Sequence, residues 1–310
     1  MFVVCGEALF DLFCDADTGS TAKVGYTAVA GGSPFNVAIG LARLGARSAL
    51  LGGVSNDFLG QRLARLLAEE GVSDRYLQRF DAPTTLAMVA LNADGSPQYS
   101  FRGEGCADRL LESTHLPALA DEVRGLHFGS YSLVVEPIAS TLAALAARES
   151  ERRLISLDPN VRLNPAPDIE RWRRRVEAMA AHAHLIKVSD EDLGLLYPGQ
   201  THETIAQRWL NQRCELVFVT RGGEGAEVFS RQHGHASEPA RSIKVADTVG
   251  AGDTFQAALL TWLAEHQLDT PEGLAQLQPA QLQALLHFAV SAAALTCTRT
   301  GPDLPRRNEL

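Results

Sequence analysis

The chain has 310 residues, of which 45% are hydrophobic and 21% charged, so it can bury one large core or two smaller ones. The 28 basic and 37 acidic residues give a net charge of −9, which argues against a general nucleic-acid binder because such proteins carry a basic face. Five scattered cysteines without a CxxC pair, no basic leader and no apolar run of roughly 18–20 residues argue against disulfides, secretion and a membrane span. We therefore expect a cytoplasmic protein without membrane or nucleic-acid partners.

Short apolar runs alternate with amphipathic stretches along the chain. Helices are predicted at residues 36–44, 58–70, 137–147 and 169–180. Strands are predicted at residues 2–5, 49–54, 125–128, 154–157, 184–188 and 216–220. This repeated alternation predicts a mostly parallel sheet that is covered by helices on both faces.

Two segments break this rhythm, residues 12–30 and residues 84–105. Each contains turn residues between two candidate strands, such as the turn at residues 92–95, which is typical of a hairpin. If the two hairpins pair into one small sheet, they form a lid over the mouth of a single domain that spans residues 1–310. The alternative is two unrelated surface hairpins.

The strongest chemical signal is the segment Asp-Thr-Val-Gly-Ala-Gly-Asp-Thr-Phe at residues 247–255, where a loop of small residues opens an amphipathic helix. The first N–H groups of a helix lack partners, so Gly250, Ala251 and Gly252 offer a site for a phosphate. Asp253 would repel that phosphate, which makes sense if its carboxylate accepts a proton from a hydroxyl that attacks the phosphate. The alternative is that Asp253 is an ordinary helix N-cap.

Two further polar segments have both a functional and a structural interpretation. In residues 31–36, Gly32 allows a ligand close to the backbone and Asn36 suits a sugar hydroxyl, but a plain helix start explains them equally well. In residues 158–162, which follow a buried strand, Arg162 is placed where open α/β sheets bind ligands and would neutralise a phosphoryl group. Ordinary turn chemistry is the alternative for Asp-Pro-Asn.

Two later segments also follow predicted strands. Residues 187–192, Lys-Val-Ser-Asp-Glu-Asp, supply acidic groups that would organise Mg²⁺ through water, or that would cap a helix. Residues 220–225, Thr-Arg-Gly-Gly-Glu-Gly, resemble a weak phosphate loop or a β-turn. The chain has no GxxxxGK[ST] loop, which excludes a P-loop enzyme.

Together these segments resemble the ribokinase (PfkB) family of carbohydrate kinases over nearly the whole chain, up to residues 301–305. Residues 6–11, 102–108, 187–191 and 298–301 look most like its fructokinase branch. The resemblance implies a ribokinase-like α/β fold, with a mostly parallel central sheet of nine or so strands, flanking helices and a small β lid. It also implies an ATP donor, Mg²⁺ and a monovalent cation, commonly K⁺.

The resemblance also assigns roles residue by residue. Asp253 would be the catalytic base. Gly250, Ala251 and Gly252 would form the anion hole, and the side chain of Arg162 would lie near the phosphates. The sugar would be held by Asp11, Gly32, Asn36 and Arg102. The nucleotide cleft would be lined by Lys187, Ser189, Thr220, Gly222 and Gly225. The monovalent cation would lie beside Asp247, Val249 and Gly301.

Three positions depart from the family pattern. Asp192 replaces the Glu of the metal-linked Asn-x-x-Glu motif and is one methylene shorter, so Glu191 would have to compensate for Mg²⁺. Val290 stands where a nucleotide-side Asn is common, and Thr300 replaces a frequent Lys.

Three functions follow as hypotheses. The first is ATP-dependent phosphorylation of a sugar, D-fructose to fructose 6-phosphate. The second keeps the enzyme but takes 2-keto-3-deoxygluconate or another ketose, with Arg102 facing an acidic sugar. The third is a non-catalytic sugar or nucleotide sensor, against which the intact Asp253 and Gly-Ala-Gly loop argue. A homodimer through the exposed lid sheet is left open.

Overall fold

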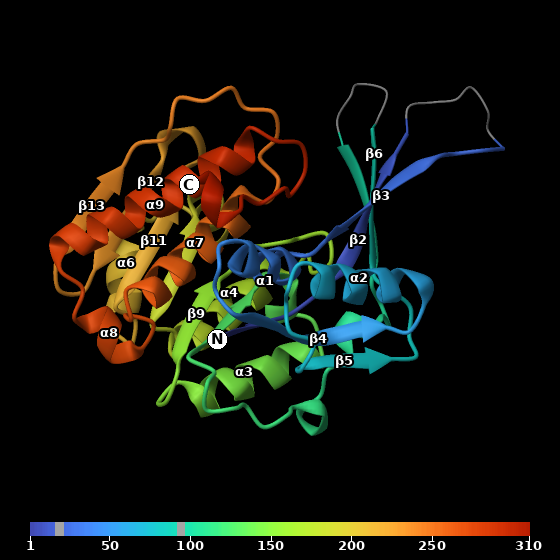
Figure 1. Ribbon diagram of the computed structural model, residues 1–310, viewed down its shortest axis with the longest axis horizontal. Helices are drawn as coiled ribbons and strands as arrows, with labels where there is room; N and C mark the ends of the chain where they lie inside the picture. Colours follow the sequence, from blue (N-terminus) through green and yellow to red (C-terminus); the bar gives the residue numbers. More distant parts are fainter. Residues whose placement is uncertain (16–21, 92–96) are drawn as a thin grey trace.

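The structure, a computed structural model, describes residues 1–15, 22–91 and 97–310. Its main element is a nine-stranded sheet in the order β13-β12-β11-β10-β9-β8-β1-β4-β5 (Figure 1). These strands are β1 (Phe2–Cys5), β4 (Ser48–Ser55), β5 (Leu77–Phe80), β8 (Gly125–Gly129), β9 (Leu154–Asp158), β10 (Leu185–Ser189), β11 (Leu216–Thr220), β12 (Ala226–Ser230) and β13 (Gly234–Glu238). The pairs from β5 to β11 are parallel and the last two are antiparallel, so the predicted mostly parallel sheet is confirmed.

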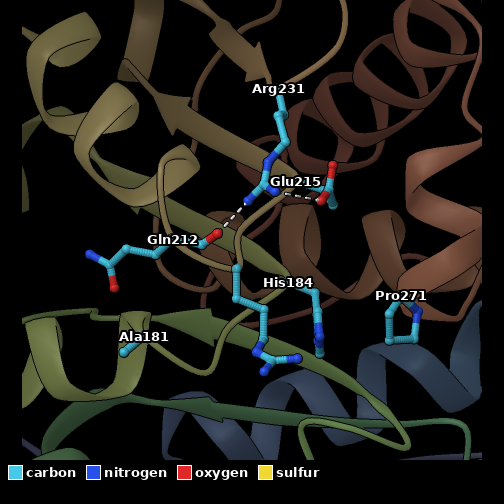
Figure 2. Close-up of a pocket in the computed structure, with 7 residues that line it drawn as sticks. Ala181, His184, Gln212, Glu215, Arg231 and Pro271 are labelled. Carbon is cyan, nitrogen blue, oxygen red and sulfur yellow. Dashed lines mark hydrogen bonds and ion pairs between the residues drawn. The ribbon is translucent and has the colours of Figure 1, made fainter.

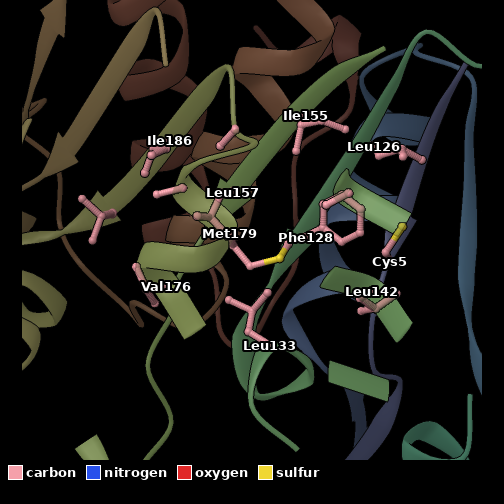
Figure 3. Close-up of a cluster of buried hydrophobic side chains, with 14 of the residues drawn as sticks. Cys5, Leu126, Phe128, Leu133, Leu142, Ile155, Leu157, Val176, Met179 and Ile186 are labelled. Carbon is pink, nitrogen blue, oxygen red and sulfur yellow. The ribbon is translucent and has the colours of Figure 1, made fainter. Parts of the chain in front are cut away.

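Helices cover both faces of this sheet, because its strands are apolar on both sides. The helices are α1 (Ser33–Arg43), α2 (Phe58–Glu69), α3 (Ile138–Glu149), α4 (Ile169–Ala180), α5 (Asp190–Leu196), α6 (His202–Leu210), α7 (Ala251–Glu265), α8 (Pro271–Ala275) and α9 (Pro279–Cys297). On one face, Phe2 and Val4 pack in a core with α1, α7 and α9. On the other face, Cys5 and Phe128 pack with Leu142 of α3 and Met179 of α4 (Figure 3).

Helix α9 is long and apolar enough to span a membrane. It is the one described helix that meets both conditions. The expectation that the chain has no apolar run of this length is therefore wrong. The helix packs along α7, and its side chains Leu282, Leu285, Leu286 and Ala289 are buried in the core. Its apolar character is therefore accounted for by packing over the sheet.

The two inserted hairpins form one small sheet in the order β3-β2-β6-β7. These strands are β2 (Leu9–Cys14), β3 (Tyr26–Gly31), β6 (Leu86–Leu91) and β7 (Pro97–Arg102). The hairpins join because β2 pairs in parallel with β6, with Asp11 opposite Ala87. The alternative of two unrelated hairpins is therefore wrong, and the sheet, called the lid below, projects beyond the helices (Figure 1). The turn expected at residues 92–95 lies outside the described residues.

Several element boundaries differ from the predicted ones. Helix α1 begins at Ser33 rather than at residue 36, because Pro34 fits the first turn of a helix. Strand β2 begins at Leu9, so the lid starts earlier than residue 12. Helix α2 begins where expected, since the Asp57 carboxylate caps it by accepting the Gly60 N–H at 2.7 Å.

Candidate active site

Asp253 lies in the first turn of α7 and is held by two neutral donors from α1. The Ser33 hydroxyl donates to its Oδ1 at 2.6 Å, and the Asn36 amide donates to its Oδ2 at 2.8 Å. Burial raises the pKa of Asp253, although these two hydrogen bonds oppose the shift. The N-cap of α7 is Gly250 and not Asp253, so the N-cap interpretation of Asp253 is wrong. A buried, oriented carboxyl of this kind is suited to accepting a proton.

The loop before α7 is tightly packed where the sequence has glycine. Gly250 has φ +81°, and a Cβ there would lie 2.9 Å from the Pro302 Cα. A Cβ at Gly252 would lie 3.0 Å from the Lys187 Nζ. The start of α7 therefore combines the positive end of a helix with a lysine ammonium, which suits an anionic group.

Lys187 is fixed by a buried ion pair at the carboxyl ends of two neighbouring strands. Its Nζ lies 2.8 Å from the Oδ2 of Asp158, and both side chains are almost fully buried. The other oxygen of Asp158, Oδ1, is buried without a partner among the described residues. The sequence pattern indicates the segment of Asp158 but gives its carboxylate no role. That role depends on β9 lying beside β10.

Asp192 holds the turn that follows β9. Ser189 caps α5 by accepting the Asp192 N–H, and the Asp192 Oδ1 accepts the Val161 N–H at 3.1 Å. Burial raises the pKa of Asp192 to about 6, and the negative charge of Asp158 adds to the shift. Among the described residues, no group of three or more His, Cys, Asp or Glu is arranged to hold a metal ion. The buried, unpartnered Oδ1 of Asp158 and the carboxylate of Asp192 are oxygen donors of the kind that Mg²⁺ takes, together with water and phosphate oxygens.

The side chains predicted for the sugar gather at the base of the lid. Asp11 lies over Gly31, where a Cβ would come within 2.5 Å of its Oδ2. Burial raises the pKa of Asp11 to about 6, while the positive charge of Arg162 opposes the shift. Gly32, at φ +105°, fits against the Glu7 carbonyl, 2.9 Å from where its Cβ would be. Asn36 is brought to the same place, but its amide is bound to Asp253.

The two arginine side chains predicted for the site have different surroundings. Arg162 is exposed and donates to the Val161 carbonyl at 3.0 Å. It lies near enough to Asp11 and Asp192 for its positive charge to oppose the rise that burial causes in the pKa of both. Arg102 ends β7 and is exposed, opposite Leu86 in the lid register. Arg162 therefore belongs to the cluster, whereas Arg102 lies at the lid margin.

The segment predicted for the nucleotide is the turn between β11 and β12. Thr220 ends β11, and the Arg221 N–H donates to the Gly225 carbonyl at 2.8 Å. Gly225 has φ +97°, and a Cβ there would lie 2.1 Å from the Glu238 carbonyl. Gly222 starts a short 3-10 helix in this turn, which leads from β11 into the antiparallel strand β12. The nucleotide role of Thr220, Gly222 and Gly225 stays a prediction. Val290, which stands in place of the nucleotide-side Asn of the family pattern, is buried on α9.

Asp247 connects the loop before α7 to the segment after α9. Its Oδ2 accepts the Gly301 N–H at 2.8 Å, and its Oδ1 accepts the Val249 N–H at 3.1 Å. The backbone donors lower the pKa of Asp247, even though partial burial works against them. A charged carboxylate between two exposed loops fits a monovalent cation in the place that the resemblance predicts.

A separate cavity lies at the amino edge of the sheet. It has a volume of about 500 Å³ and is lined by His184 and Glu215, which precede β10 and β11 (Figure 2). Arg231 beside it is bound to the Gln212 carbonyl at 2.7 Å and lies 3.3 Å from Glu215 (Figure 2). Because its charges are paired and it is remote from Asp253, this cavity is not the candidate site.

Comparisons with known proteins agree with this geometry. A family model described as pfkB family carbohydrate kinase matches residues 1–308. A fructokinase of Rhizobium leguminosarum bv. trifolii is 38% identical over 307 residues, covering 99% of this chain and 88% of that protein. The structure of a fructokinase with bound ATP from Xylella fastidiosa has a TM-score of 0.91 at 27% identity, covering 99% of this chain and 96% of that one.

A third similar protein is described with a sugar, a nucleotide and a metal ion bound. The structure of a fructokinase double mutant from Vibrio cholerae O395, in a form with fructose, ADP and potassium ion bound, has a TM-score of 0.79 at 28% identity. The match covers 97% of this chain and 93% of that one. The likeness thus extends over the large sheet and the lid together.

Proposed function

The chain belongs to the pfkB family of carbohydrate kinases, and we propose that it transfers a phosphoryl group from ATP to D-fructose, giving fructose 6-phosphate. The observation that carries the proposal is the position of Asp253 in the first turn of α7, with the ammonium of Lys187, from β10, against the same turn. The fructokinase relatives cover nearly all of this chain, which supports fructose as the acceptor.

Asp253 acts as the base in this reaction. The primary hydroxyl oxygen of fructose attacks the terminal phosphorus of ATP, its proton moves to the Asp253 carboxylate, and the bond to ADP breaks as the new O–P bond forms. Ser33 and Asn36 fix the direction of the carboxylate through the hydrogen bonds described above. The raised pKa of Asp253 makes it a stronger proton acceptor than an exposed aspartate.

The charge that moves onto the leaving phosphate is stabilised by preset donors. Gly250, Ala251 and Gly252 present the N-terminus of α7, and Lys187 stands against the same loop. Asp158 keeps Lys187 in place through their buried ion pair. Groups of this kind contribute on the order of 100–1000-fold in rate each, because they need no reorganisation in a site that excludes water. Arg162 adds a further cation at the edge of the cluster.

Two cations complete the proposal. Mg²⁺ would be held near Asp158 and Asp192 through water, and it supplies neutralisation of the ATP phosphates. K⁺ would lie beside Asp247, Val249 and Gly301, where it supports the loop before α7. Asp247 and Asp192 also position other parts of the site. Asp247 holds the loop before α7 to the segment after α9, and Asp192 holds the turn that carries Arg162.

The substrate pockets follow from the same arrangement. Asp11 and Gly32 bind sugar hydroxyls at the base of the lid, with Arg102 at its margin. Ser189, Thr220, Gly222 and Gly225 line the nucleotide cleft at the carboxyl ends of β10 and β11. We also propose that the enzyme works in the cytoplasm, which suits its five free thiols.

The experiment is an ADP-release assay with ATP, Mg²⁺ and K⁺ against fructose, glucose, ribose, tagatose and 2-keto-3-deoxygluconate. We expect turnover with fructose and loss of at least 1000-fold in kcat for Asp253→Asn, with fructose binding retained. Asp269→Asn is the matched control, because Asp269 is an equally buried carboxylate outside the site. It lies 3.5 Å from Arg124, the residue that directly precedes β8. More than a few per cent of activity in Asp253→Asn would sink the assignment of the base.

A further inference from the structure

The lid is anchored at a pair of threonines that directly precede β6. Both Thr84 and Thr85 are buried, and each is held by a different carboxylate. Asp57 accepts the Thr84 N–H at 2.8 Å and the Thr84 hydroxyl at 2.7 Å, and Asp108 accepts the Thr85 hydroxyl. The chain therefore enters the lid at a fixed point.

The chain leaves the lid at the same point. The Ala107 N–H donates to the Pro83 carbonyl at 3.0 Å, which ties the outgoing chain to the incoming one. The short 3-10 helix Ala107–Arg109 packs on β4, where a Cβ at Gly53 would lie 2.0 Å from the Ala107 carbonyl. Asp108 thus fixes both ends of the hairpin β6–β7: its carboxylate holds Thr85 just before β6, and it lies six residues after the end of β7.

The turn that follows β8 links Asp108 to a second buried carboxyl group. In the turn after β8, the Tyr131 hydroxyl donates to the Asp108 Oδ2 at 2.7 Å, and the adjacent Ser132 hydroxyl donates to the Glu7 Oε2. The turn begins at Ser130 with φ +59°, a backbone conformation that is unfavourable for serine. Neighbouring residues of one turn therefore each hold one carboxyl.

Glu7 in turn contacts the segment that holds the catalytic base. Its side chain is 1% exposed, and its carbonyl lies 2.9 Å from where a Cβ of Gly32 would be. Gly32 directly precedes Ser33, whose hydroxyl binds Asp253. The Glu7 Oε1 is buried without a partner among the described residues, so the hydroxyl of Ser132 is the main link of this side chain.

These contacts form one continuous chain, which we call the lid brace: Thr85, Asp108, Tyr131, Ser132 and Glu7. We propose that the lid brace is a positioning device that sets the lid relative to Ser33 and Asp253, so that the sugar is held in line with the base. The five residues act through their contacts with one another, with the lid and with Gly32, and are therefore positioning residues. The inference rests on the proposed function, since it assigns the brace a part in binding the acceptor sugar.

The test compares two variants that each remove one tyrosine hydroxyl from a carboxylate. Tyr131→Phe breaks the brace, and we expect the KM for fructose to rise about tenfold while kcat falls less than threefold, because one hydrogen bond to a charged group has about this worth. Hydrolysis of ATP without sugar is expected to rise relative to phosphorylation. Tyr197→Phe is the control, since the Tyr197 hydroxyl donates to Glu177 at 2.6 Å away from the lid.

A structural role alone would lower the melting temperature in both variants and leave the KM for fructose within twofold of the parent, and that result overturns the brace. Thr85→Val and Thr85→Ser serve if Tyr131→Phe does not fold: the valine is expected to reproduce the rise in KM and the serine to restore the parent value. Equal KM values for the two Thr85 variants also overturn it.

Hydrogen exchange separates failure of the brace from failure of the proposed function, because it needs no turnover. Amides of β6 and β7 are expected to exchange faster in ligand-free Tyr131→Phe than in Tyr197→Phe. Equal exchange in the two variants overturns the brace whatever the sugar. Should the parent phosphorylate another sugar from the panel, the KM comparison is made with that sugar.

Discussion

At the scale of single residues, the reactivity of Asp253 depends on two donors and on burial. Because the base must be unprotonated, activity falls as the pH drops through its raised pKa. Ser33→Ala removes a donor to the charged form, so the pKa of Asp253 rises further and the acidic limb of kcat/KM moves to higher pH. The pH–rate profiles of both proteins measure this, with Ser140→Ala, a surface change at Glu136, as the control. A limb that stays in place or moves to lower pH contradicts the prediction.

Burial of Glu7 leads to a prediction about how the stability of the protein depends on pH. Burial raises its pKa from 4.5 to about 7, so the folded protein keeps a proton that the unfolded chain loses over that range. Stability from this group is therefore full below pH 4.5 and declines as the pH rises to 7, by about 3 kcal/mol in all. Glu7→Gln cannot ionise and still accepts from Ser132, so its melting temperature should equal the parent's at pH 4 and exceed it at pH 8. Parallel curves for the two proteins would show that Glu7 does not titrate this way.

At the scale of elements, the start of α7 needs glycine for a local and a packing reason. Gly250→Ala forces an alanine to φ +81° and sets its Cβ against Pro302, so the loop must move and kcat is expected to fall about 10–100-fold. Gly71→Ala is the matched control, because Gly71 has φ +76° with no neighbour near its Cβ position. Both substitutions cost about 1–2 kcal/mol of stability by thermal melting. Equal activity in the two variants would refute a special role for the loop.

At the scale of the whole molecule, the lid leaves an apolar row uncovered. Phe13, Val89 and Tyr99 are opposite one another across three strands, and Phe13 and Tyr99 are 41% and 56% exposed. Asp11 and Phe13 are two residues apart on β2, so the row lies on the same lid face as Asp11. Exposed apolar surface of this kind favours association.

We therefore predict a homodimer through the lid. Light scattering should give twice the 33.4 kDa mass of the chain at micromolar concentration, and Phe13→Lys with Tyr99→Lys should give the mass of a single chain. Exposed Phe58 lies on α2, outside the lid, so Phe58→Lys should leave the mass of the dimer unchanged. A single-chain mass for the parent protein contradicts the prediction.

Much of this architecture can be predicted from local patterns. The alternation of strands and helices, the lid hairpins and the loop before α7 depend on residues that are close in sequence, so a single chain reveals them. Parallel strands also bring their carboxyl ends to one edge, which is why polar segments at residues 158–162 and 187–192 mark the site in advance.

The contacts that make the site specific depend on which strands are neighbours, and local patterns do not contain that information. Asp253 meets Ser33 across 220 positions of the chain, and Lys187 meets Asp158 because β9 lies beside β10. Asp192 illustrates the same limit: its sequence position indicates a metal motif, and only the fold shows that its Oδ1 also holds the Val161 N–H. The sequence by itself thus determined the elements and their reactive ends, whereas only the tertiary structure decided how carboxylates and donors pair, since pairing requires proximity in space.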